Sequence, residues 1–481
     1  MTTTAPAPPE HSTSSRRWWA LAAIGLAQLL VIIDMTIMTI ALPSAQRELG
    51  MSDATRQWAI TGYTVAFGGL LLLGGRLADR LGRKNTLLVG AIGFALASAI
   101  GGAATSPTML IAARAGQGVF AAILAPSTIS LLTTTFTEPR ERARVFGIFS
   151  AIMMSGAALG LVAGGALAEY LDWRWCLYVN LPIATVAAVL GAIVLPKVEG
   201  HRDTPLDWIS AVIGGGAIVS LVYALSEAAE QGFGSGLVLG LLGASLVLVV
   251  AFVARQARVR GPLLPLSVVT ERSRAAAFLG VAFAAFGMFG MFLFLTFQLQ
   301  VIMGYGAFLA GVAFLPFVLG NVVTSTQLTS RLAPRTGPRP LLAGGLLLLA
   351  VSMALLTRLT PESSFVGLLL PAEILLGAGA GLVMPTVINT ATQGVRPKDA
   401  GVTSAFITTS QQVGASLGTA ALNTIAASAT ASVAVGGAAA TVHGYATASG
   451  WAAGVLAVGA VVAGVLYRRP APQPTTPQEA R

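Results

Sequence analysis

Residues 75–84 read Gly-Arg-Leu-Ala-Asp-Arg-Leu-Gly-Arg-Lys, and residues 330–339 read Ser-Arg-Leu-Ala-Pro-Arg-Thr-Gly-Pro-Arg. The two stretches align without a gap and share Arg, Leu, Ala, Arg and Gly at the same places. Each lies between two long apolar segments. An internal repeat in a chain this hydrophobic indicates a transporter built from two related halves.

The composition places the chain in a membrane. Of its 481 residues 55% are hydrophobic and 10% are charged, and the mean hydropathy is +0.77. Soluble chains carry about a quarter charged residues, so lipid must be the solvent for this apolar surface. The net charge of +10 therefore says little about nucleic acid, because the basic loops of a membrane protein face anionic lipid, and no nucleic-acid partner is expected. One cysteine and three histidines, without ligand spacing, predict no metal site.

A membrane helix needs roughly 20 apolar residues, and fourteen segments meet this requirement. They are residues 18–42, 55–76, 86–105, 108–134, 142–167, 174–195, 207–227, 236–255, 273–302, 306–329, 339–358, 364–391, 400–426 and 444–467. With the N-terminus placed in the cytoplasm, cytoplasmic segments hold 24 of the 29 Lys and Arg, and outer loops hold four. This asymmetry follows the positive-inside rule and predicts that both termini are cytoplasmic.

The repeat divides the chain into a six-helix half, two inserted helices and a second six-helix half. Gly118 and Pro126 of the fourth span match Gly377 and Pro385 of the twelfth. Both halves enter from the cytoplasm, so the repeat is parallel, with its pseudo-two-fold axis along the membrane normal. The predicted parts are a tail (1–17), an N-terminal bundle (18–199), the inserted helices with their linkers (200–272), a C-terminal bundle (273–469) and a second tail (470–481).

Several motifs resemble those of the major facilitator superfamily, and specifically of its fourteen-span drug:proton antiporters. Residues 75–84 resemble the signature loop between the second and third spans. The other matching residues are Ile33–Ile37 with Ala41, Leu42 and Pro43; Gln57, Trp58 and Tyr63; Arg114, Gln117, Gly118 and Pro126; and Trp173, Arg174, Trp175, Asn180 and Pro182. The chain departs from the antiporter motif of the fifth span at Leu161, where that motif has proline.

The resemblance implies an all-α integral membrane protein with the major facilitator fold and fourteen transmembrane helices. It also implies a monomeric, proton-coupled exporter in the bacterial plasma membrane that needs no cofactor besides the proton gradient. Its partners would be a small-molecule substrate, protons and the lipid bilayer. No nucleotide loop or nucleophile arrangement is present in the sequence, which predicts neither an enzyme nor an ATP-driven pump.

Three ionisable residues fall at membrane depth, where charge is expensive and therefore usually functional. Asp34, Arg114 and Glu373 each lie roughly 9–14 Å below the outer membrane edge, at ~1.5 Å per residue. The resemblance places their spans around one central cavity. We expect all three in proton coupling, with Glu373 also binding a substrate cation. The alternatives are a static Asp34–Arg114 ion pair and a Glu373 that is neutral against a neighbouring helix.

The signature loop predicts a conformational latch made of Gly75, Asp79, Arg80, Gly82 and Arg83. By resemblance, Asp79 meets the N-terminus of the thirteenth span near Gly401, where the helix dipole favours an anion. This contact would hold the cytoplasmic side closed. The alternative is that the basic residues of the loop only set the topology.

Small residues and polar residues complete the candidate sites. Glycines at a four-residue spacing allow close helix packing and predict a seam between the two halves; they are Gly156, Gly160, Gly164, Gly414 and Gly418. The candidates for substrate contact, besides Glu373, are Tyr63, Phe297, Gln298, Gln300 and Asn389.

The leading hypothesis is export of lipophilic, cationic drugs or toxic compounds from the cytoplasm by alternating access. A second hypothesis is a dedicated exporter of an endogenous metabolite, such as an antibiotic or siderophore. A third is a non-transporting membrane scaffold or sensor, which would not need three buried charges at one depth.

Overall fold

The computed structural model describes residues 14–196, 200, 207–259, 262–396, 399–433 and 437–467, and these ranges are helical, without strands. The first half contains α1 (Ser14–Leu49), α2 (Asp53–Leu81), α3 (Arg83–Gly102), α4 (Pro107–Thr135), α5 (Pro139–Tyr170), α6 (Trp175–Tyr178) and α7 (Asn180–Val194). Next come α8 (Trp208–Gln231), α9 (Gly236–Gln256) and the short α10 (Leu266–Thr270).

The second half contains α11 (Arg272–Phe297), η1 (Gln298–Ile302), α12 (Ala307–Ala313), α13 (Leu315–Val323), η2 (Thr324–Thr329), α14 (Ser330–Thr336), α15 (Pro338–Leu356), η3 (Phe365–Leu369), α16 (Leu370–Thr392), α17 (Ala400–Ala431) and α18 (Ala438–Leu466). The three η segments are single π-helical turns inside longer spans. Of the predicted tails, residues 1–13 and 470–481 lie outside the described ranges, whereas residues 14–17 begin α1.

Fourteen membrane spans agree with the sequence prediction. Thirteen described segments are long and apolar enough to cross a bilayer. The fourteenth is α17, which has 32 residues but carries Thr, Ser and Gln over residues 408–412. Because α17 packs against α2, α11 and α18, these polar groups lie partly within the protein, where lipid imposes no penalty on them.

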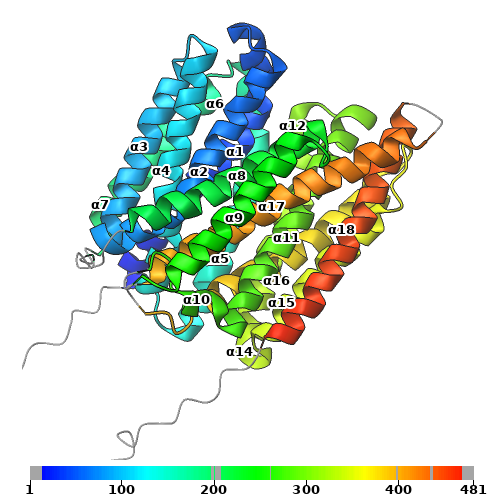
Figure 1. Cartoon of the computed structure of the whole chain (residues 1–481). Helices are drawn as coiled ribbons and strands as arrows, with labels where there is room; N and C mark the ends of the chain where they lie inside the picture. The colour runs from blue at the N-terminus through cyan, green and yellow to red at the C-terminus, as the bar shows by residue number, and fades with distance from the viewer. Residues whose placement is uncertain are drawn as a thin grey trace, which may run out of the picture.

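The spans form two bundles, which lie on the left and the right of Figure 1. The N-terminal bundle consists of α1–α7 and the C-terminal bundle of α11–α18. The bundles meet where α17 contacts α2 and α4, and where α5 contacts α12, α13 and α16. We refer to the end of the molecule at which α1 begins and α18 finishes as the termini end, and to the other as the opposite end.

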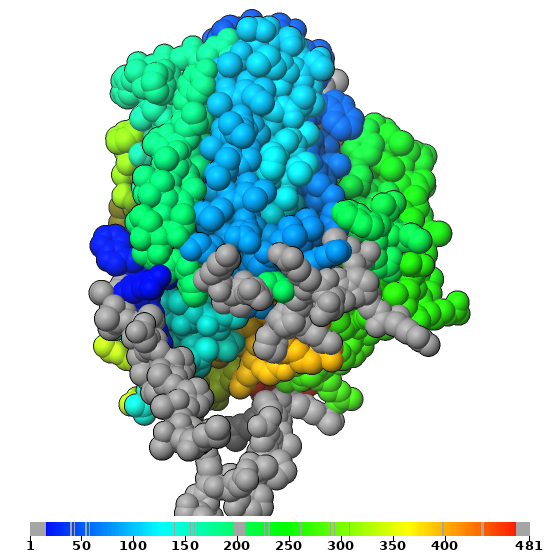
Figure 2. All heavy atoms as spheres, turned by 90° about the vertical axis from the view of Figure 1, so that its left-hand side faces the viewer, coloured from blue at the N-terminus to red at the C-terminus, as the bar shows by residue number. Residues whose placement is uncertain are grey.

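Large apolar side chains cover the outside of the bundles. On α3, Val89, Ile92, Leu96 and Ile100 are each more than half exposed, and their spacing of three or four residues puts them on one helix face. Figure 2 shows this side of the N-terminal bundle, with α9 (green) beside it. A large exposed apolar surface indicates contact with a membrane or another protein, and a membrane fits the composition.

Glycine packing supports the repeat. A Cβ on Gly118 would overlap the carbonyl oxygen of Tyr63, and a Cβ on Gly377 would overlap that of Phe317. These glycines hold the same place on α4 and α16. Because neither has a side chain, the neighbouring span can approach closely at both positions. The similar packing of the two glycines supports the alignment, which matches Arg114 with Glu373.

The prediction that Gly156, Gly160, Gly164, Gly414 and Gly418 line the seam between the halves was wrong. The first three pack against Leu29, Ile33, Thr36 and Ile37 of α1, and the last two against the carbonyls of Ala282 and Phe286 of α11. Each contact is internal to one bundle. The spacing indicates that a helix is approached closely but does not indicate which helix approaches it.

Candidate functional site

A fully enclosed polar network occupies the centre of the N-terminal bundle. Asp34 on α1 accepts hydrogen bonds from Arg114 Nη1 at 2.5 Å, Gln117 Nε2 at 2.7 Å and Asn180 Nδ2 at 2.7 Å. Gln117 also donates to Ser98 Oγ at 2.7 Å. Asp34 is 0% and Arg114 3% exposed. The network joins α1, α3, α4 and α7, and three hydrogen bonds fix the position of the carboxylate.

The guanidinium of Arg114 has contacts on every side. It donates to Gln117 Oε1 at 2.8 Å and to the Ala59 carbonyl at 3.3 Å, and it lies 4.5 Å from the ring centroid of Tyr63. A buried charge is tolerated only with such compensation, and removal of one partner from a buried pair typically costs about 3–5 kcal/mol. Asp34 and Arg114 are thus one unit, as the sequence predicted from their depth.

Sequence reasoning missed Ser98, and it identified Gln117 and Asn180 only as motif members without a role. Gln117 follows Arg114 by three residues, so both side chains emerge on one helix face. Ser98 follows the apolar stretch 87–97 of α3, and Asn180 begins α7, which is mostly apolar. A polar residue alone in such a span needs a partner inside the bundle, and this is the signal that could have found them.

Glu373 lies in the C-terminal bundle, three residues into α16. Its side chain is 0% exposed, and neither carboxyl oxygen has a hydrogen-bond partner among the described residues. It precedes Gly377 by one helical turn, on the face that meets Phe317 of α13. The structure does not join Glu373 to Asp34 or Arg114, whose described partners all belong to the N-terminal bundle.

Asn321 is a second buried polar residue beside α16. Its side chain is 0% exposed and neither of its polar atoms has a partner among the described residues. Its backbone packs against Gly377 and Gly381, next to the π-helical turn η2. Among the described residues, the C-terminal bundle therefore holds these two polar side chains without hydrogen bonds, whereas in the N-terminal bundle both carboxylate oxygens of Asp34 are hydrogen-bonded.

Asp79 joins the two bundles at the termini end. Its carboxylate accepts hydrogen bonds from the backbone N–H of Gly401 at 2.9 Å and of Val402 at 3.3 Å, both in the first turn of α17. The N-terminus of a helix carries unpaired N–H groups and a positive partial charge, so it binds an anion well. The geometry matches the predicted contact near Gly401.

Glycines at this contact let the backbones touch. A Cβ on Gly75 would lie 2.6 Å from the Gly401 carbonyl oxygen, and a Cβ on Gly401 would lie 2.6 Å from Asp79 Oδ1. Gly82 has φ +90°, which glycine adopts readily, and it lets α3 begin directly after α2. Arg83 lies 3.8 Å from Asp79, whereas Arg80 forms no ion pair with it in the described part of the chain.

Two further contacts cross between the bundles at this end. Arg76 Nη1 donates to Asp399 Oδ1 at 3.3 Å, next to the start of α17. Arg142 of α5 donates to Thr392 Oγ1 of α16 at 2.5 Å. The termini end is therefore closed on both sides in this structure.

The substrate candidates do not form one site. Phe297 and Gln298 belong to the opposite end, where the ring of Phe297 meets Tyr445 at 5.4 Å and Gln298 Nε2 donates to the Thr360 carbonyl at 3.4 Å. Asn389 follows Glu373 by sixteen residues of helix, or ~24 Å. Tyr63 is buried beneath Arg114, and Gln300 is half-buried in η1. Residue type alone did not indicate depth or direction.

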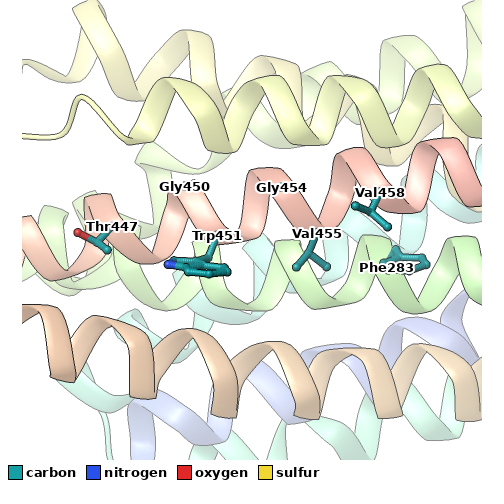
Figure 3. Close-up of a pocket in the computed structure, with 7 residues that line it drawn as sticks. All are labelled: Phe283, Thr447, Gly450, Trp451, Gly454, Val455 and Val458. Atoms are coloured by element: carbon teal, nitrogen blue, oxygen red, sulfur yellow. The ribbon is translucent and has the colours of Figure 1, made fainter.

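A groove of about 590 Å³ lies on the outside of the C-terminal bundle. It is lined by Phe283 of α11 and by Thr447, Gly450, Trp451, Gly454, Val455 and Val458 of α18, and Figure 3 shows their side chains along the two helices. Trp451 and Val458 are more than half exposed. The groove is apolar, faces outward, and contains none of the buried charges, so it is a surface for lipid.

Comparison with known proteins gives one consistent family. The sequence pattern of the Major Facilitator Superfamily matches residues 24–419. The puromycin resistance protein pur8 of Streptomyces alboniger is 51% identical over 464 residues, which cover 94% of this chain and 91% of that protein. The multidrug efflux pump LfrA of Mycolicibacterium smegmatis is 31% identical, with 87% of this chain and 82% of LfrA covered.

A solved structure shares the fold. The human organic anion transporter MFSD10 superposes with a TM-score of 0.67 over 95% of this chain and all of that chain, at 15% sequence identity. The cephamycin export protein CmcT of Amycolatopsis lactamdurans is a further relative, 37% identical over 87% of each chain.

Proposed function

The chain belongs to the Major Facilitator Superfamily, and we propose that it is a proton-coupled antiporter that exports lipophilic, cationic drugs or toxic compounds from the cytoplasm. The observation that carries this proposal is the enclosed Asp34–Arg114 network in one bundle, together with the unpaired acid Glu373 in the other. Buried ionisable groups are costly in a membrane protein and mark ion or substrate pathways.

Orientation follows from charge. The basic loops cluster at the termini end, so the positive-inside rule puts this end, with both termini, in the cytoplasm of a bacterial cell. Cysteines introduced at Ser106 and Ser364 in a Cys176→Ala background should then react with an impermeant maleimide from outside. A third cysteine at Thr204, which lies outside the described residues, should react only in broken cells. Labelling of the Thr204 position in intact cells would contradict this topology.

Asp34 is suited to carry a proton because its protonation changes its contacts. The carboxylate accepts from three donors. Protonation removes its charge and converts one acceptor oxygen into a donor, so Arg114 or one of the amides must find another partner. The network joins four helices, and hence a proton bound at Asp34 shifts the packing of the bundle. A ligand drives a conformational change only through such a difference between two states.

Glu373 provides an acid without a fixed cation. The repeat gives the N-terminal bundle a base, Arg114, at the position where the C-terminal bundle has this acid. An ionised carboxylate in an apolar site is strongly disfavoured unless a cation or hydrogen-bond donors accompany it. Glu373 therefore requires either a proton or a cationic group of the substrate, and exchange of one for the other is the basis of antiport.

The latch supplies the conformational half of the mechanism. Asp79 holds the N-terminus of α17, and Arg76 and Arg142 add contacts across the seam. All three contacts must break before the cavity can open to the cytoplasm and load substrate. The oligomeric state consistent with this mechanism is a monomer, because both bundles and all the proposed residues are in one chain.

Everted membrane vesicles test the proposal. With an acid interior, wild-type vesicles should accumulate ethidium, a permanently charged lipophilic cation, and should lose it when the pH gradient is collapsed. Vesicles with an unrelated membrane protein at equal expression serve as the control. Accumulation that survives collapse of the gradient would rule out proton coupling.

A dedicated exporter of one metabolite is the second candidate, since several relatives have names that refer to resistance to, or export of, single antibiotics. The same vesicles decide between the two. Efficient transport of puromycin together with poor transport of ethidium and other lipophilic cations would favour the dedicated exporter.

A further inference from the structure

The two inserted helices lie over the seam between the bundles. α8 packs against α2 of the N-terminal bundle and against α17 of the C-terminal bundle. Figure 1 shows α8 and α9 crossing the front of the molecule beside α2 and α17. The hairpin of α8 and α9 thus contacts the two helices that must separate when this side of the termini end opens.

The contact with α2 is extensive and close. A Cβ on Gly215 of α8 would lie 2.5 Å from the Gly69 carbonyl oxygen of α2, so the two backbones touch. A Cβ on Gly68 would meet Ile218 at 3.1 Å. Nearer the opposite end, the rings of Trp58 and Tyr223 are 5.5 Å apart. Backbone-to-backbone packing of this kind allows little sliding.

The linker between α9 and α10 binds Arg76, which lies next to the latch residue Asp79. Arg76 donates from Nε to the Leu263 carbonyl at 2.7 Å and from Nη2 to the Pro262 carbonyl at 2.6 Å. The same guanidinium reaches Asp399 through Nη1. Arg76 is only 4% exposed, so its donors need these acceptors. The linker carbonyls therefore set the direction in which Arg76 crosses the seam.

Gln256, at the end of α9, holds the linker in place. Its Oε1 accepts from the Leu264 N–H at 3.1 Å, and its Nε2 donates to Ser210 Oγ at the start of α8 at 2.7 Å. Gln256 is 4% exposed. One amide side chain thus ties both helices of the hairpin to the residue that follows the two Arg76 acceptors.

Apolar packing completes the arrangement. One buried cluster contains Leu72 of α2, Ile218 and Val222 of α8, Phe252 of α9, Leu263 and Leu264 of the linker, and Val402 and Ala405 of α17. The cluster joins the hairpin, its linker and both bundles. Only the last two members belong to the C-terminal bundle, and they lie in the first turns of α17.

We infer that the inserted hairpin and its linker form a strut that moves with the N-terminal bundle and positions Arg76 for its contact with Asp399. Gln256 is the positioning residue, because it acts through the linker and touches neither substrate nor proton. The inference rests on the alternating access of the proposed function. When the termini end opens, Asp399 and α17 move away from Arg76, while the guanidinium of Arg76 keeps its hydrogen bonds to the linker carbonyls.

The first test replaces Gln256 by methionine, which keeps the length of the side chain but removes both hydrogen bonds. Spin labels at Leu81 and Thr336, exposed positions of the two bundles at the termini end, report the opening in a Cys176→Ala background. Gln256→Met should weaken the hydrogen bond from Arg76 to Asp399, which the linker positions. The ratio of open to closed molecules should therefore rise about tenfold, the usual effect of one buried hydrogen bond.

Ser245→Ala is the matched control. Ser245 is equally buried and donates to the Ala217 carbonyl inside the hairpin at 2.9 Å, away from the linker. It should leave the distance distribution unchanged. If both variants open the molecule equally, the hairpin only adds stability, and the inference is wrong. If Gln256→Met has no effect while Asp79→Ala opens the molecule, the inference is wrong and the proposed latch stands.

The second test follows the strut itself and needs no change in the hairpin network. One label pair joins Val247 of α9 to Leu96 of α3, and the other joins Val247 to Val465 of α18, all on exposed faces. Between wild type and Asp79→Ala, the first distance should stay constant and the second should change. A change in the first distance alone would assign the hairpin to the C-terminal bundle. Failure of proton-driven transport would leave both distance results intact, so the two proposals can fail separately.

Discussion

Substitution of Gly401 by alanine would test the closed termini end most sharply, because one methyl group enters the contact between α2 and α17. The added Cβ would lie 2.6 Å from Asp79 Oδ1 and would overlap the Gly75 carbonyl oxygen. The carbonyl is backbone and cannot rotate away, so the helices must separate. Separation also stretches the hydrogen bonds from Gly401 and Val402 to Asp79.

The magnitude follows from two terms. Overpacking of a tight contact costs about 1–3 kcal/mol, and weakening of a hydrogen bond to a charged group costs about 1.5–3 kcal/mol at most. Because the bond is strained and not lost, about 2–4 kcal/mol in total is a reasonable expectation. The higher helix propensity of alanine acts equally on the open and closed states and cancels. The ratio of open to closed molecules should therefore rise roughly 30- to 1,000-fold.

The assay is the distance between spin labels at Leu81 and Thr336, with turnover measured in parallel. The distribution should move to longer distances, and turnover should fall while substrate binding remains. Gly240→Ala on α9 is the control, since an added Cβ there has no atom within 4 Å. An unchanged distribution in Gly401→Ala would refute the reasoning, because the added methyl group could then be accommodated without separation of the helices.

Three further predictions concern the charged groups. Asp34→Asn should abolish substrate uptake driven by a pH gradient but retain exchange of labelled for unlabelled substrate, and retained gradient-driven uptake would move the coupling elsewhere. Glu373→Gln should weaken binding of a cationic substrate roughly ten- to a hundredfold, the value of a charge-assisted contact, and spare a neutral one of equal size; equal losses would assign Glu373 to the fold. Burial alone would raise the pKa of Asp207, but hydrogen bonds from Arg255 and Ser210 lower it to about 2. Asp207→Asn should be less thermally stable than wild type. Since the folded pKa is depressed, this difference in stability should be constant above about pH 4 and should shrink as the pH falls towards 2. A difference that disappears between pH 8 and 6 would contradict this sign.

The spans were predictable because lipid demands long apolar helices, and the repeat fixed their grouping. The interruptions were not predictable. The tenth predicted segment divides into α12, α13 and η2, and the twelfth begins with the π-helical turn η3, although the sequence predicts each as one continuous helix. Local hydrogen-bond patterns of this kind depend on neighbouring helices and leave no mark in the hydropathy.

The buried charges were predictable by depth, but their partners were not. Asp34 and Arg114 lie in one layer and do pair. Glu373 lies at similar depth but contacts neither residue, because depth does not determine the direction in which a helix face points. Phe297 and Asn389 illustrate the same limit at the two ends of the C-terminal bundle. A single sequence indicates which residues are costly to bury, while the packing decides which of them meet.

The central claim is the exchange of protons for substrate, and one measurement tests it directly. Purified protein is placed in liposomes that contain a pH-sensitive dye, and ethidium is added outside with no initial pH gradient. Because ethidium is permanently charged, it carries no proton itself. Coupled exchange predicts that the internal pH rises as ethidium enters, and that neither change occurs with Asp34→Asn or in liposomes without protein. Entry of ethidium through the wild-type protein at constant internal pH would contradict proton-coupled antiport.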